Sequence, residues 1–72
     1  MRVTLMHPIK TFTNETDALA ARVFKTGSGY LVTLRDTESL RELPTRWHYY
    51  EEERAFKRAE FLAFPERFTT EP

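Results

Sequence analysis

Few residues of this 72-residue chain have the types and spacing that catalysis or metal binding requires. The chain has no cysteine, and its two histidines, His7 and His48, do not form the closely spaced pair of a zinc motif. The densest carboxylate group is Glu51, Glu52 and Glu53. We interpret these glutamates as the first turn of a helix, where the helix dipole stabilises negative charge. The sequence therefore predicts no catalytic residue, no metal site and no cofactor, and we do not expect an enzyme.

The only two glycines flank Ser28, and this short segment is the one candidate for a phosphate-binding loop. It lacks the lysine of a P-loop and the third glycine of a dinucleotide-binding loop. We therefore expect Gly27, Ser28 and Gly29 to form a helix cap and a turn.

A group of basic and aromatic residues near the C-terminal end could bind a partner instead. At 100° per residue its central members share the outer face of a predicted helix. Arginine and aromatic side chains are frequent anchors of protein interfaces. In an alternative interpretation, the cations pair with Glu51, Glu53 and Glu60 one turn away, and Phe61 packs against the C-terminal tail. The group consists of Arg54, Lys57, Arg58, Phe61 and, just beyond, Phe64.

A second candidate surface is the open face of the predicted sheet. Arginine and aromatic residues on such a face can stack single-stranded bases, and the same face could also form the centre of a homodimer. The signature of an RNA-recognition motif is absent, so nucleic-acid binding is the alternative here and protein binding the main prediction. The residues proposed for this face are Arg35, Arg46, His48 and Tyr50.

The segment 14–26 has the residues that begin and end a helix. Thr13 or Asn14 can cap the first N–H groups, and Asp17 follows Asn14 at the spacing of a capping box. Gly27 then stands where a helix commonly ends. We predict a helix over 14–26 on these grounds. In the alternative, residues 21–26 form a strand that turns at the glycines into the next strand.

The remaining patterns complete an α+β domain. Alternating apolar residues predict strands over 2–6, 30–35 and 43–50, and an alanine-bearing apolar stripe ended by a proline predicts a helix over 51–63. This order predicts a mainly antiparallel sheet with both helices on one face, in a ferredoxin-like or split βαβ layout. The tail is expected to be frayed or to form a short edge strand carrying Phe68.

Length and charge limit the organisation of the chain. Its 72 residues predict a single domain over 1–72, with an ordered core over 1–65 and a tail or edge strand over 66–72. Eleven basic and eleven acidic residues cancel, which argues against a dedicated nucleic-acid or membrane-surface binder. The sequence contains neither a signal-peptide core nor a membrane-length apolar run, so we expect a cytoplasmic protein.

The segment YLVTLRDTESLRELP, followed by WHYYEEERAFKRA, combines a predicted strand pair with an alanine-bearing helix within residues 30–59. This arrangement resembles the compact α+β scaffold of small bacteriophage and mobile-element proteins that interact with their host. The resemblance implies a stoichiometric inhibitor or adaptor acting in the host cytoplasm, such as an anti-CRISPR protein or a modulator of host RNA polymerase. Many such inhibitors are acidic mimics of nucleic acid, whereas this chain is neutral, which favours docking through a surface.

Overall fold

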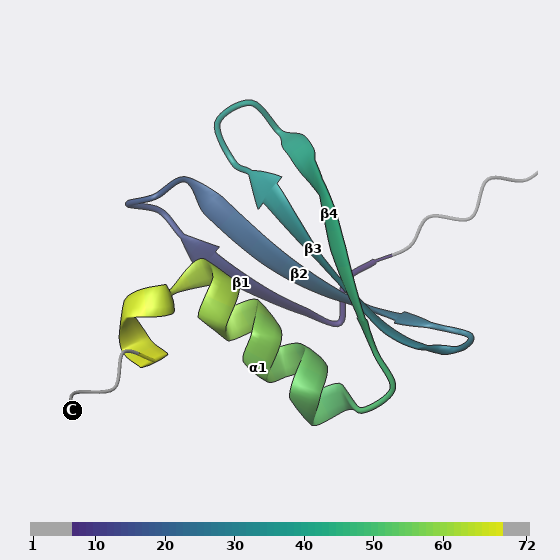
Figure 1. Cartoon of the computed structure of the whole chain (residues 1–72). Helices are drawn as coiled ribbons and strands as arrows, with labels where there is room; N and C mark the ends of the chain where they lie inside the picture. The colour runs from purple at the N-terminus through teal and green to yellow at the C-terminus, as the bar shows by residue number, and fades with distance from the viewer. Residues whose placement is uncertain (1–6, 69–72) are drawn as a thin grey trace, which may run out of the picture.

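Four consecutive strands form one antiparallel sheet in the order β1-β2-β3-β4 (Figure 1). The structure is a computed structural model, and it describes residues 7–68. Within residues 7–68, one α-helix, α1, lies across one face of the sheet and is followed by a short 3-10 helix, η1. The predicted strands over 30–35 and 43–50 and the helix over 51–63 are confirmed within one or two residues. The elements are β1 Lys10–Asn14, β2 Leu19–Thr26, β3 Gly29–Asp36, β4 Arg41–Tyr49, α1 Glu52–Ala63 and η1 Pro65–Phe68.

Three alanines spaced four residues apart hold α1 against the sheet. Ala55, Ala59 and Ala63 have no exposed surface, and they face the fully buried Val23 and Val32 of the two central strands. Small side chains allow the helix to approach the sheet closely, so the thin core needs few large aliphatic residues. The larger side chains that surround this contact are Phe12, Tyr30, Leu34, Trp47, Tyr49, Phe56, Leu62 and Phe64.

The predicted helix over 14–26 is wrong, because the residues expected to cap it form a turn between β1 and β2. The backbone N–H of Asp17 donates to Asn14 Oδ1 over 3.1 Å, and Ala18 has a φ of 55°. A side-chain oxygen that accepts an N–H three residues on is common to helix caps and to Asx turns. The alternative interpretation, a strand over 21–26 that turns at the glycines, is confirmed.

The ferredoxin-like layout is not confirmed, since it requires a second helix between the first two strands. The observed sheet is an antiparallel meander covered by α1 alone over the described residues. Residues 65–68 form η1 and not a strand. The predicted strand over 2–6 and the tail beyond residue 68 lie outside the described residues.

Gly29, at the start of β3, is required by the close approach of β4. Its φ is +146°, and a Cβ added there would lie 2.5 Å from the carbonyl oxygen of Tyr49. We expect Gly29→Ala to lower the free energy of unfolding by about 1–3 kcal/mol, measured by urea denaturation with Trp47 fluorescence. Gly27→Ala is the matched control, because a Cβ there meets nothing within 4 Å. Equal stability of the two variants would contradict the proposed crowding.

Candidate functional site

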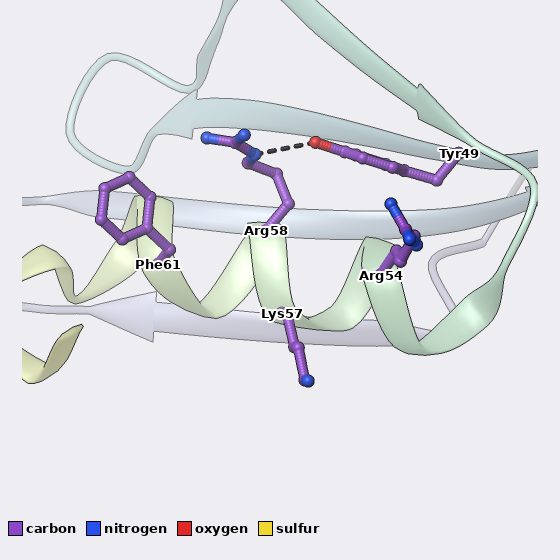
Figure 2. Close-up of a pocket in the computed structure, with 5 residues that line it drawn as sticks. All are labelled: Tyr49, Arg54, Lys57, Arg58 and Phe61. Atoms are coloured by element: carbon purple, nitrogen blue, oxygen red, sulfur yellow. Dashed lines mark hydrogen bonds between the residues drawn. The ribbon is translucent and has the colours of Figure 1, made fainter.

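A groove with a volume of about 440 Å³ lies between α1 and the end of β4 (Figure 2). It is lined by Tyr49, Arg54, Lys57, Arg58 and Phe61. The structure thus brings together the four residues predicted on the outer helix face, and it adds Tyr49. No acidic side chain is part of this lining.

Two elements position the groove residues. The alanine stripe of α1 faces the sheet, so the side of the helix next to that stripe is turned toward β4. Tyr49 is the last residue of β4, and only Tyr50 and Glu51 separate it from the helix. The Arg58 side chain reaches across the groove, where its Nε donates to the Tyr49 hydroxyl over 2.8 Å (Figure 2). This bond ties the helix to the edge strand at the floor of the groove.

Sequence reasoning missed Tyr49 as a groove residue. The signal that could have found it is strand alternation, which places Tyr49 on the same face as Trp47. Both side chains pack partly against the core beside α1. Tyr49 is also the partner of Tyr30 in the register of β3 and β4, which fixes its position relative to the sheet centre.

Two of the groove cations form ion pairs within the helix. Arg54 Nε lies 3.0 Å from Glu51, and Lys57 Nζ lies 3.5 Å from Glu53. The alternative sequence interpretation is confirmed for these two pairs. Both pairs are exposed, and such pairs contribute only about 0.3–0.5 kcal/mol each to stability. A carboxylate of a partner can therefore replace either glutamate at little cost.

Arg58 and Phe61 form the central part of the groove. The Arg58 guanidinium lies 5.7 Å from the centre of the Phe61 ring, and the Phe61 residue is 39% exposed. Within the described residues, no carboxylate forms an ion pair with Arg58. Glu60, which the sequence offered as a pairing residue, lies 3.4 Å from Arg67 instead. Lys57 lies at the rim and points away from Tyr49 (Figure 2).

Phe64, the fifth residue of the predicted cluster, does not widen the groove. It follows the last residue of α1 with a non-helical backbone, and its ring packs partly against the core. The Arg67 guanidinium covers this ring at 3.9 Å. The predicted helix also ends at residue 63, so the helical period does not give the direction of the Phe64 side chain.

Arg35, Arg46 and His48, proposed for the open sheet face, lie opposite α1, whereas Tyr50 follows the last residue of β4. A carboxylate lies among the arginines of this face. Glu42 pairs with Arg35 in the strand register, and its side chain lies 3.4 Å from Arg22 and 4.0 Å from Arg46. Sequence reasoning missed both Arg22 and Glu42, whose meeting depends on the strand order. Near the end of the strand, the rings of His48 and Tyr50 meet edge to face at 5.4 Å. On this face one carboxylate, Glu42, thus compensates part of the charge of three arginines, Arg22, Arg35 and Arg46.

Metal and membrane sites were also sought in residues 7–68. Over this range, no group of three or more His, Asp or Glu residues is placed to hold a metal ion. No helix in the same range is long and apolar enough to cross a membrane. No protein-family model, curated protein or solved structure matches the chain.

Proposed function

We propose that this chain is a non-catalytic binding protein that docks an acidic segment of a partner protein in the groove between α1 and β4. The observation that carries the proposal is the composition of the groove. Three cations and two aromatic rings line it, and no acidic side chain does. A carboxylate-bearing segment with an apolar residue would complement both the charge and the rings.

The physical basis is that interface energy is concentrated in few residues. Arginine and tyrosine are enriched among the residues that dominate such sites, and tyrosine loses little rotamer freedom relative to the contact area that it provides. Here Arg58 is already held by its bond to the Tyr49 hydroxyl, and its guanidinium lies beside Phe61. Preorganisation of this kind reduces the entropy lost on binding.

The proposal is compatible with the role that the scaffold resemblance implies, a stoichiometric inhibitor or adaptor encoded by a phage or mobile element. The chain has a net charge of zero, so broad mimicry of nucleic acid is a poor fit. Docking through one localised groove requires no such excess of charge. The partner class that we propose is a host protein or nucleoprotein complex with an exposed acidic segment.

The test is affinity capture from cells of the source organism with three versions of the chain. Phe61→Ala removes an exposed anchor of the groove, and Leu40→Ala removes an apolar residue that is 64% exposed between β3 and β4. We expect wild type and Leu40→Ala to recover the same partner in equal amount, and Phe61→Ala to recover about tenfold less. Equal recovery by Phe61→Ala would show that the groove is not the docking site.

A further inference from the structure

The outer edge of β4 lies directly beside the groove. In the sheet order β4 pairs only with β3, and no other strand of the described residues pairs with its second edge. An edge strand presents unpaired N–H and C=O groups that can pair with an added chain. Pro44 has no N–H, so it interrupts this edge and leaves the segment from Thr45 to Tyr49 for pairing.

The register shows which residues of β4 present those groups. A two-residue loop joins Thr26, the last residue of β2, to Gly29, the first residue of β3. These two residues therefore form a hydrogen-bonded pair. Hydrogen-bonded and non-hydrogen-bonded residue pairs alternate along an antiparallel ladder. At the other end of the β2–β3 ladder, the N–H of Thr37 donates to the carbonyl oxygen of Ala18, as this alternation requires.

Tyr30 and Val32 belong to the pairs that are not hydrogen-bonded to β2. Their backbone N–H and C=O groups therefore point toward β4, at Tyr49 and Trp47. It follows that the backbone groups of Arg46 and His48 point to the outer edge.

A second, smaller hollow connects this edge to the groove. Its volume is about 260 Å³, and it shares Tyr49 and Arg54 with the groove. His48, Tyr50 and Glu51 complete its lining. The outer edge of β4 and the cations of α1 thus belong to one continuous surface.

We infer that the acidic partner segment binds as an added antiparallel strand on the outer edge of β4. This inference rests on the proposed function and specifies how the segment docks. Residues of the segment opposite Arg46 and His48 exchange backbone hydrogen bonds with β4. Side chains opposite Trp47 and Tyr49 lie on the same face as those two residues, since cross-strand partners share a face. On that face an acidic side chain meets the cations beside Tyr49.

Charge complementarity favours an acidic segment over a second copy of this chain as the added strand. If β4 of a second copy occupied the edge, its side chains on the helix-facing side would include Trp47 and Tyr49, which carry no negative charge. Trp47 and Tyr49 of a second copy would therefore bring no negative charge to the groove.

The test uses a fluorescein-labelled heptapeptide that alternates valine and glutamate, with fluorescence anisotropy as the readout. When the glutamates face the groove, the valine amides point toward β4 and the glutamate amides point away. N-methylation of the valine amides should weaken binding about tenfold, through loss of two hydrogen bonds. N-methylation of the glutamate amides, the matched control, should change binding less than about threefold.

Each outcome decides the inference separately from the proposed function. Equal effects of the two methylation patterns, or no saturable binding of the peptide to the wild-type chain, would overturn strand addition. Neither result would bear on the proposed function, which the affinity capture with Phe61→Ala and Leu40→Ala tests independently. A shift of the wild-type chain from monomer to dimer on concentration, together with no saturable binding of the unmethylated peptide, would overturn the inference in favour of a second copy.

Discussion

Arg54→Glu combined with Arg58→Glu is expected to weaken binding of the valine–glutamate heptapeptide about thirtyfold. The two reversals remove two attractive charges from the groove and put like charges next to the peptide glutamates, which together changes the binding free energy by about 2 kcal/mol. Fluorescence anisotropy at low ionic strength measures the effect. Raising the salt concentration should shrink the difference, because mobile ions screen exposed charges.

The matched control for this prediction is Lys10→Glu combined with Arg41→Glu. Both residues are exposed, neither lines the groove, and the change in net charge is the same. This control should bind the peptide within about threefold of wild type. If both double variants lose affinity equally, the attraction comes from net charge and not from the groove. Circular dichroism checks that the Arg58 variant, which loses its bond to Tyr49, remains folded.

Asn14→Asp is expected to cause the largest loss of stability among conservative substitutions in this chain, about 2–4 kcal/mol. Asn14 is 5% exposed, and its Nδ2 donates to the carbonyl oxygen of Ala63 over 2.7 Å. The carboxylate would lose this donor and bring a negative charge to the same carbonyl. The Asn14 amide also donates to the Asp17 carboxylate over 3.2 Å, so the substitution places two acids together.

Urea denaturation followed by Trp47 fluorescence measures this loss, and thermal unfolding should show a melting temperature at least about 10 °C lower. Asp17→Asn is the control, because residue 17 is exposed and its backbone N–H keeps the bond to Asn14 Oδ1. We expect this control to stay within about 1 kcal/mol of wild type. A small effect of Asn14→Asp would mean that the link from the β1–β2 turn to the end of α1 contributes little to the fold.

The same residue explains where sequence reasoning failed. Asn14 and Asp17 have the spacing of a helix cap, but the bond that they form also closes a turn. What decides between the two is tertiary: the Asn14 amide reaches the last residue of α1, 49 positions along the chain. A sequence pattern over a few residues contains no information about that contact. The strands over 30–35 and 43–50 and the helix over 51–63 were identified because their apolar periodicity reflects burial directly, whereas β1 was not predicted.

The candidate site was predictable to the extent that it depends on one helix. The 3.6-residue period places Arg54, Arg58 and Phe61 on one side of α1 without knowledge of the sheet. Tyr49 could not be assigned to the groove in this way, since its position depends on how β4 pairs with β3. Phe64 lies beyond the helix in the prediction and in the structure, and its packing against the core does not follow from the 3.6-residue period.

The most direct measurement of the central claim is photo-crosslinking in cells of the source organism. Benzoylphenylalanine in place of Phe61 puts a photoreactive ring in the groove, and the same residue in place of Arg35 puts it on the open sheet face. The groove proposal predicts a specific crosslink to one partner protein from position 61 and none to that partner from position 35. A crosslink from position 35 alone, or a crosslink from position 61 to nucleic acid and not to protein, would contradict it.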